Sequence, residues 1–489
     1  MNHKKAIIIG AGIAGIASAI RVKKLGYDVI VFESNNKAGG KLNEKKIGEY
    51  RFDMGPSLFT MPQYVEELFE LSNKKTSDYF RYKKCKNTCN YFFEDGTFIS
   101  LCSDKEKNHI TILNTLGVSP IPYEKRIKNS AFIYSKTHKI FLEKSLHKLK
   151  NYFTFDILKS ILAIPRLSIF TSMNRANENN LNHPKLVQIF NRYATYNGSN
   201  PYKAPGILNI IPHLENEFGV FFPENGMYSI TKSLEKLAID LGVEFKFNSK
   251  VEEIIIEKNM AKGVRCNSKP YFSDVVINNV DVNFTYNHLL KKEFKTNHIK
   301  REPSSSALIF YWGIKKSFSN LDLHNIFFSD DYKSEFETIF NTKDKIPEDP
   351  TIYVNISSKH SKSDAPKGKE NWFVMVNTQY NQGQNWETYR TKIREIILSK
   401  LSRMLKQDIE KLIEEEDFLD PILIEKNTSS IGGSLYGSSS NTKFAAFLRH
   451  PNFSKIKNLY FVGGSVHPGG GIPLCLLSAK IVSKEFISI

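Results

Sequence analysis

A chain of 489 residues is too long for one compact core, so we expect two or three intertwined subdomains. Hydrophobic residues make up 41% of the chain, which is ordinary globular composition, and no run of about 20 apolar residues predicts a membrane-spanning helix. The formal charge of +17 indicates an anionic partner, and without a nucleic-acid-binding motif or an arginine-rich tail we expect no nucleic acid.

The start of the chain leads directly into a predicted strand, without a charged and apolar leader, so we expect a cytoplasmic protein. The five cysteines form no CxxC pair and no ligand cluster with histidine: Cys85, Cys89, Cys102, Cys266 and Cys475. This pattern predicts reduced thiols and no metal site.

The first motif in chain order is a strand, a glycine-rich turn, a helix and a second strand. Residues 6–9 and 28–32 are apolar, β-branched runs typical of buried parallel strands. Between them lie three glycines with G-x-G-x-x-G spacing, which are Gly10, Gly12 and Gly15. Glu33 stands at the end of the second strand.

Each part of this motif has a physical reason. The first glycine allows a tight turn, the second lets the backbone approach a pyrophosphate, and the third lets helix and strand pack closely. The helix N-terminus favours the phosphate charge. Glu33 can accept hydrogen bonds from a ribose diol and would repel a 2′-phosphate, which argues against NADP. The motif therefore predicts an ADP-containing dinucleotide, with a plain βα turn as the alternative.

Further along, the pattern predicts a sheet built from discontinuous pieces, with a second domain inserted between them. A helix over 230–241 precedes three β-like runs, and a buried strand with a polar exit lies within 272–281. Other predicted elements are a β region at 89–102, strands at 307–314 and 371–380, a charged helix at 389–416, and a closing strand, turn and helix at 458–486.

Basic residues alternate with Leu, Ile and Phe over residues 136–170, where Tyr152, Phe153 and Phe155 cluster. Such a segment can lie on an anionic bilayer with its aromatic side buried. A helical subdomain with a solvated lysine face is the alternative, and the sequence alone leaves both open.

Motifs along nearly the whole chain resemble the bacterial carotenoid desaturases, which are FAD-dependent relatives of phytoene desaturase among the amine-oxidase-like flavoproteins. These motifs are GAGIAG, AGGKL, FDMGPS, RYATYNGSNPYKAP, VFFPENGM, HNIFFSDDY, GGSLYGSSSN and LYFVGGSVHPGGGIPL. The resemblance implies an α/β fold with a Rossmann-like FAD-binding domain, an inserted mixed α+β substrate domain and a helical, membrane-facing region. The expected boundaries are 1–75, 220–285 and 425–489 for the FAD-binding domain, 76–135 and 286–424 for the substrate domain, and 136–219 for the helical region.

The resemblance also implies where FAD is held. The expected contacts are Gly39, Gly40 and Lys41 at the pyrophosphate; Gly55, Pro56, Ser57 and Leu58 beside the isoalloxazine ring; Val251, Asn279 and Asp281 at the adenosine half; and Gly464, Ser465, Gly471 and Ile472 at the ribityl chain and flavin edge. Many relatives have arginine in place of Lys41, and lysine keeps the charge but loses the bidentate fork.

The implied reaction removes two hydrogens from adjacent saturated carbons beside a polyene, one as hydride to flavin and one as a proton to a base or water. The cofactor performs the difficult step, so the sequence points to no firm catalytic residue. His467 is the candidate for the base, with a role in shaping its turn as the alternative, and Glu215 and Asp53 are further candidates with structural roles as theirs.

The closing motif is most similar to the branch that forms the 3,4 double bond of 1-hydroxylated carotenoids such as 1′-hydroxy-γ-carotene. A phytoene desaturase is the alternative, followed by a carotene cis–trans isomerase or a flavin-free binding protein similar to the Rab GDP-dissociation inhibitors. We expect a carotenoid taken from the bilayer, peripheral association with an anionic membrane, and oxygen or a quinone as electron acceptor.

Overall fold

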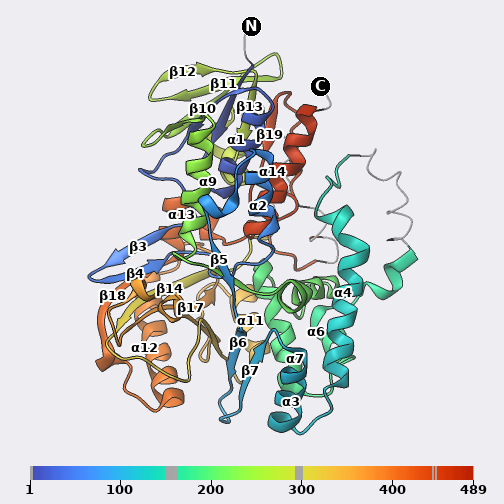
Figure 1. Ribbon diagram of the computed structural model, residues 1–489, viewed down its shortest axis with the longest axis vertical. Helices are drawn as coiled ribbons and strands as arrows, with labels where there is room; N and C mark the ends of the chain where they lie inside the picture. The colour runs from blue at the N-terminus through green and yellow to red at the C-terminus, as the bar shows by residue number, and fades with distance from the viewer. Residues whose placement is uncertain are drawn as a thin grey trace.

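The computed structural model describes residues 4–148, 160, 162–291, 294, 301–442, 445 and 449–487. Figure 1 shows an upper part that contains both ends of the chain, a lower part built on a second sheet, and a lobe of helices on the right. Residues 149–159 and 161, with Tyr152, Phe153 and Phe155, lie outside the described residues.

The upper part is built on a five-stranded parallel sheet whose order is β19-β13-β1-β2-β9. Its strands are β1 (Lys5–Ile9), β2 (Asp28–Phe32), β9 (Glu244–Lys246), β13 (Val275–Asn278) and β19 (Leu459–Phe461). A three-stranded antiparallel sheet adjoins it: β10 (Val251–Glu257), β11 (Met260–Cys266) and β12 (Lys269–Phe272). The main sheet thus draws on the beginning, middle and end of the chain, as the sequence predicts.

Helices cover this sheet because its strands are apolar on both faces. They are α1 (Ile13–Lys24), α2 (Gln63–Leu71), α9 (Tyr228–Asp240) and α14 (Ile472–Ile487). Helix α1 packs against α9 and α14, and Ile16 and Ile20 are fully buried there. A Cβ atom on Gly15 would lie 2.1 Å from the carbonyl oxygen of Gly10, so only glycine permits this approach of helix to strand.

The lower part is a seven-stranded sheet of order β18-β14-β17-β16-β15-β6-β7, antiparallel except between β15 and β6. Its strands are β6 (Asn87–Phe92), β7 (Phe98–Cys102), β14 (Ser306–Ile314), β15 (His324–Phe327), β16 (Ile352–Asn355), β17 (Glu370–Thr378) and β18 (Ile413–Leu419). Helix α12 (Trp386–Leu405) packs one face, where Trp312 and Trp372 are fully buried. Alternate residues of each strand therefore face the opposite side.

The helical lobe and the connections complete the chain. The lobe contains α3 (Lys105–Leu116), α4 (Ile121–Phe141), α6 (Met173–Glu178), α7 (Pro184–Asn191) and α8 (Ile211–His213). The connections contain α10 (Val282–Phe284), α11 (Tyr332–Asn341), α13 (Pro421–Thr428), and two ribbons, β3 (Glu44–Ile47) with β4 (Tyr50–Asp53) and β5 (Tyr82–Lys84) with β8 (Phe221–Pro223). Within the described parts of the chain, we find no helix that combines the length and apolarity needed to cross a bilayer.

One predicted element is wrong in its second half. The charged helix predicted over 389–416 ends at Leu405, because Lys406 adopts the left-handed conformation with φ of 53°. The chain then returns as β18 along β14, and Arg394 pairs with Glu416 across the two elements. The acidic run that reads as helix surface is therefore an edge strand, fixed by pairing with a strand about 100 residues earlier.

Candidate active site

A cavity with a volume of about 660 Å³ lies between the two sheets and the helical lobe. This volume falls within the range of small-molecule sites, roughly 300–1,000 Å³. The cavity begins at the glycine-rich turn after β1, passes α14, and reaches the lower sheet at Phe373 and the lobe at Ile207. It therefore joins the dinucleotide motif to a second, apolar space.

Most of the residues that the sequence predicts for FAD line this cavity. They are Gly10, Gly12, Glu33, Gly39, Gly40, Lys41, Gly55, Pro56, Ser57, Leu58, Asn279, Asp281, Gly464, Ser465, Gly471 and Ile472. Gly15 and Val251 are buried and do not belong to the lining. Gly15 packs on the Gly10 carbonyl, while the Val251 side chain joins a core that contains Phe32.

The N-terminus of α1 faces the cavity through Ile13 and Ala14. Gly12 is its N-cap residue and provides no side-chain hydrogen bond, so the first N–H groups of the helix stay available to an anion. A Cβ atom at Gly12 would lie 2.7 Å from Nδ2 of Asn279. A side chain at residue 12 would therefore collide with Asn279 at the position where the sequence predicts the pyrophosphate.

Glu33 fixes the turn that carries the glycines. Its Oε2 accepts a hydrogen bond of 2.7 Å from the backbone N–H of Ala11, and its Oε1 accepts from the backbone and side-chain nitrogens of Asn35 at 2.9 and 2.8 Å. A carboxylate oxygen has two acceptor directions, so Oε2 can accept a further bond from a ribose hydroxyl. The buried carboxylate thus fits both the loop and the ribose.

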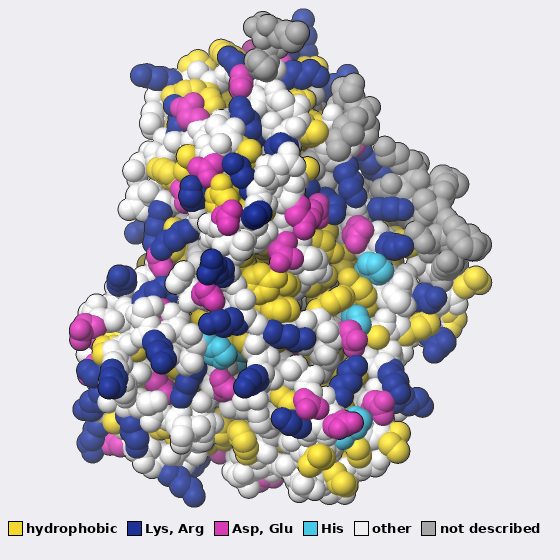
Figure 2. Space-filling model, in the orientation of Figure 1, with side chains coloured by type: hydrophobic (Ala, Val, Ile, Leu, Met, Phe, Trp, Pro, Cys, Tyr) yellow, Lys and Arg dark blue, Asp and Glu magenta, His cyan; other side chains and the backbone are white. Residues whose placement is uncertain are grey.

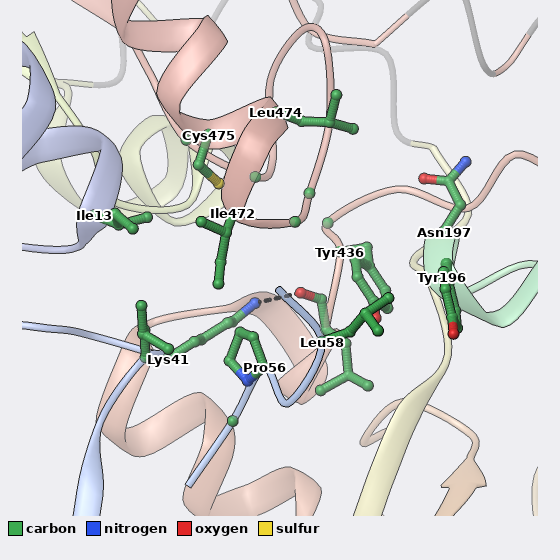
Figure 3. Close-up of a pocket in the computed structure, with 18 of the residues that line it drawn as sticks. Ile13, Lys41, Pro56, Leu58, Tyr196, Asn197, Tyr436, Ile472, Leu474 and Cys475 are labelled. Carbon is green, nitrogen blue, oxygen red and sulfur yellow. Dashed lines mark hydrogen bonds between the residues drawn. The ribbon is translucent and has the colours of Figure 1, made fainter. Parts of the chain in front are cut away.

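Lys41 reaches across the cavity and lies beside Pro56, below Ile472 and Cys475 (Figure 3). Its Nζ donates hydrogen bonds of 2.8 Å to the carbonyl oxygens of Ser434 and Leu435. Burial lowers the pKa of Lys41 to about 8, against the opposing effect of Asp281. Because an ammonium has three N–H groups, one remains for an anionic ligand.

The start of α14 forms the other side of this part of the cavity. Ile472, Leu474 and Cys475 line it. Gly471 precedes the helix with φ of 109°, and a Cβ atom there would meet no other atom within 4 Å, so the backbone faces open space. Asp281 caps α10 by accepting from the N–H of Asn283 at 2.8 Å, and burial raises its pKa. Gly471 and the start of α14 thus offer the glycine backbone and the helix N-terminus that the sequence predicts for the flavin end of FAD.

The lower sheet supplies an apolar wall. Its cavity-facing residues lie side by side across neighbouring strands, in the order Leu419, Ile309, Met375, Tyr353 and Ile326. The regular alternation along each strand places them on the face away from α12. This wall suits a long apolar molecule.

Beside this wall stands a group of buried or half-buried polar side chains that we call the polar cluster: Tyr91, Arg192, Tyr193, Tyr196 and Glu215. Arg192 donates hydrogen bonds to the hydroxyl oxygens of Tyr196 at 2.7 Å and of Tyr91 at 3.0 Å. Tyr193 and Tyr196 donate to Glu215 at 2.7 and 2.5 Å. Arg192 and Tyr196 line the cavity, and they lie in the motif RYATYNGSNPYKAP, to which the sequence assigned no role.

The sequence also missed Arg449, which is fully buried and lines the cavity. Its guanidinium donates to the carbonyl oxygens of Tyr436 at 2.8 Å and Gly464 at 3.3 Å, and burial lowers its pKa to about 10. A polar residue between Leu448 and His450 gives no sign of burial along the sequence. Only the tertiary fold places this charge beside the turn that contains Gly464.

The candidates for acid–base chemistry lie elsewhere or serve the fold. His467 is buried outside the cavity lining, its Nε2 lies 2.9 Å from the carbonyl oxygen of Lys144, and burial lowers its pKa to about 4. Asp53 accepts from the backbone N–H groups of Met227 and Tyr228 at the start of α9. Neither position favours proton transfer with a molecule in the cavity.

Comparison with known proteins agrees with this site. Residues 13–487 match the family model of flavin-containing amine oxidoreductases. The chain is 54% identical over 98% of both chains to a 1-hydroxycarotenoid 3,4-desaturase from Flavobacterium sp., and 32% identical to a 4,4′-diapolycopene oxygenase from Methylomonas sp. over 100% of this chain and 99% of that one. A double mutant of putrescine oxidase has the same fold, with a TM-score of 0.65 at 12% identity, covering 100% of this chain and 99% of that one.

The matches confirm three expectations drawn from the sequence. The fold is the flavin-binding fold of the amine oxidases, the cofactor is FAD, and the protein is an oxidoreductase. The cavity lining described above fits that cofactor at the glycine turn, at Glu33 and at the start of α14. This chain therefore belongs to the flavin-containing amine oxidoreductases and, within that family, to the carotenoid desaturases.

Proposed function

We propose that this protein is an FAD-dependent desaturase that forms the 3,4 double bond of a 1-hydroxylated carotenoid. The similarity to the Flavobacterium enzyme supports the reaction and the branch. The observation that carries the proposal is the continuity of the cavity from the FAD-binding turn to the apolar wall of the lower sheet. A long hydrocarbon can lie along that wall with one end at the cofactor.

Bound FAD would accept the hydride and so supply the oxidising power. The chain's own residues orient the substrate and keep water away. Ser57 lies in the loop beside the expected flavin position, and its hydroxyl is 2.7 Å from that of Tyr353 on the apolar wall. This hydrogen bond fixes the wall relative to the loop, which positions the two reacting carbons. The assignments of individual FAD contacts, including Asn279 and Ser465, are part of this proposal.

The domain boundaries expected from the sequence are part of this proposal. Peripheral association of the protein with a membrane is a further part of it. Leu162 and Phe170 in the helical lobe are 75% and 64% exposed. Their chain neighbours Ala163 and Ile169 pack in a local core with Ile207, which lines the cavity. Figure 2 shows Lys and Arg spread over the visible face, with hydrophobic side chains at the right-hand edge over the lobe. Lys148 of the basic segment is bound by Glu485, so apolar side chains rather than this lysine support docking. Oxygen or a membrane quinone is the proposed electron acceptor.

The test uses FAD-loaded protein and vesicles that contain either phytoene or a 1-hydroxylated carotene. We expect a product two hydrogens lighter and a small red shift of absorbance from the hydroxylated substrate only. Stepwise conversion of phytoene into coloured products would assign the protein to the phytoene desaturase branch instead. A product that gains oxygen would point to the reaction named for the oxygenase relative.

A further inference from the structure

The wall of the cavity carries a histidine side chain that the predicted cofactor site does not use. His324 at the start of β15 is buried and lines the cavity. Its strand runs parallel to β6, with Asn325 opposite Asn90, so His324 and Tyr91 of the polar cluster face the same side. Ile326, two residues further along the same face of β15, lies directly opposite Tyr91, which places His324 next to the polar cluster.

The hydrogen bonds around this ring determine which nitrogen carries its hydrogen. Burial and the nearby Arg192 lower the pKa of His324 to about 3, so the ring is neutral. Nδ1 lies 2.7 Å from the hydroxyl of Tyr353 and 3.4 Å from the amide nitrogen of Asn355, which is a donor. Because the Asn355 amide nitrogen can only donate, it favours the tautomer in which Nδ1 accepts and Nε2 carries the hydrogen, and the Tyr353 hydroxyl can then donate to Nδ1.

Nε2 is buried and has no hydrogen-bond partner among the described residues. A buried donor without an acceptor is unfavourable, and in the wall of a cavity a ligand can supply the missing partner. Tyr196 offers the complementary group on the side of Arg192. Its oxygen accepts one bond from Arg192 and donates to Glu215, which leaves a second acceptor direction.

We infer that His324, together with Tyr196, binds the hydroxyl group of the substrate. A hydroxyl can accept from Nε2 and donate to a tyrosine oxygen, whereas a hydrocarbon end can do neither. The inference deepens the proposed function and rests on it. Two hydrogen bonds of 2.7 Å link His324 through Tyr353 to Ser57 in the loop beside the flavin position. Since one carbon separates a C1 hydroxyl carbon from the 3,4 bond, binding the hydroxyl there keeps that bond near the cofactor.

The position of Tyr196 agrees with this role. Figure 3 shows Tyr196 and Asn197 beyond Tyr436 and Leu58, on the side of the pocket away from Lys41 and Ile13. The dinucleotide part of the cavity lies at Lys41 and Ile13, so the polar cluster stands at the substrate side. A hydroxylated end would pair with the polar groups of the pocket, whereas an unhydroxylated end would leave them buried and unpaired. This difference is the strongest form of selectivity available to such a pocket.

The experiment compares FAD-loaded wild type with His324→Leu, His324→Gln, Tyr196→Phe and Tyr332→Phe. Each is given vesicles with a 1-hydroxylated carotene or with the same carotene lacking the hydroxyl, and both kcat/KM and equilibrium binding are measured. We expect the wild type to prefer the hydroxylated carotene, and His324→Leu and Tyr196→Phe to reduce this preference by about tenfold through KM. His324→Gln retains a donor and should restore most of it.

Tyr332→Phe is the matched control, because Tyr332 also lines the cavity but lies outside the polar cluster. It should keep the full preference. Flavin content and thermal unfolding show whether each variant has folded. If His324→Leu does not fold, the comparison of Tyr196→Phe with the wild type decides the test. An unchanged preference in folded variants at both positions would overturn the subsite while the proposed function stands. A wild type that converts neither carotene, or both equally well, would instead refute the proposed substrate.

Discussion

At the scale of single residues, Glu33 connects the structure of the glycine turn to its function. The carboxylate holds the N–H groups of Ala11 and Asn35, and the same side chain lines the cavity where the ribose is expected. Removal of the carboxylate would therefore disturb both the loop and the ligand.

Replacing Glu33 with Arg should abolish retention of FAD. The change removes the acceptor for Ala11 and for the ribose and buries an unpaired charge in their place. Flavin absorbance per mole of purified protein is the measurement. Glu244→Arg is the control, since Glu244 lies on the neighbouring strand β9 but is exposed. Stoichiometric flavin in Glu33→Arg would contradict the assignment of the ribose contact.

Lys41 predicts a pH dependence of FAD binding. Its folded pKa of about 8 lies below the usual lysine value, so it loses its proton as the pH rises through 8, while the charge is present below that value. If the charge assists an anionic cofactor, the dissociation constant of FAD rises above pH 8. Titration of the apoprotein with FAD at several pH values measures this. Lys41→Arg keeps its charge and should lose the dependence, and an equal dependence in both proteins would contradict the role.

Lys41 also makes the stability of the fold depend on pH, and here a rising pH is favourable. The unfolded chain keeps the Lys41 proton up to its ordinary pKa near 10.5, while the folded chain releases it near 8. Between these values the unfolded state binds more protons, so this group contributes increasing stability as the pH rises. Burial of the charged form is thus a cost present below pH 8.

At the scale of elements, the turn after α12 shows how tertiary pairing overrides a helical pattern. Lys406 ends the helix in a left-handed conformation that glycine adopts more readily. Lys406→Gly should raise the free energy of unfolding by about 0.5–1 kcal/mol, because the relief of backbone strain exceeds the added entropy of the unfolded chain. Denaturant titration is the measurement. Lys392→Gly, in the exposed middle of α12, should lower stability by about 1 kcal/mol, and a loss at Lys406 would contradict the explanation.

Elements with local signals could be predicted from the sequence. The strand predicted at 28–32 is observed at the same residues, and the run at 6–9 differs by one residue, because apolar runs bounded by glycine depend little on distant contacts. Strand β18 could not be predicted, because its acidic residues are neutralised by partners on other elements. Leu419 of the apolar wall lies just after the end of the predicted helix, at a position where the sequence predicts no strand.

The candidate site also contains some contacts that could be predicted from the sequence and others that could not. The glycines and Glu33 follow from spacing alone, because one βαβ unit brings them together. The partners of Lys41 lie almost 400 residues further along the chain, at Ser434 and Leu435. The pairing of His324 with Tyr353 depends on which strands are neighbours in the sheet. Spacing within the chain carries no information on such contacts.

At the scale of the whole molecule, the two sheets and the helical lobe enclose one cavity with two chemistries. The upper end offers backbone N–H groups and buried charges, and the lower end offers an apolar wall. The lobe adds exposed apolar side chains near the part of the cavity lined by Ile207 and Ile211. With the lobe docked on a bilayer, as proposed above, an apolar substrate would pass from the lipid to the wall without crossing water.

This arrangement predicts that the lobe anchors the protein to lipid. Leu162→Glu combined with Phe170→Glu should reduce sedimentation with anionic vesicles severalfold, because two exposed apolar groups no longer enter the interface. Phe272→Glu is the control, since Phe272 is 61% exposed on β12 at the other end of the molecule. Equal sedimentation of the lobe variant and the control would contradict docking through the lobe.

The central claim is that this cavity couples a bound flavin to the dehydrogenation of a hydroxylated carotenoid. The most direct measurement mixes FAD-loaded protein with vesicles of a 1-hydroxylated carotene in the absence of oxygen and any other acceptor. The account predicts that the oxidised flavin absorbance falls in step with the formation of one equivalent of a product two hydrogens lighter. A product that forms only with oxygen and carries an added oxygen atom, or no change in the flavin while product accumulates, would contradict it.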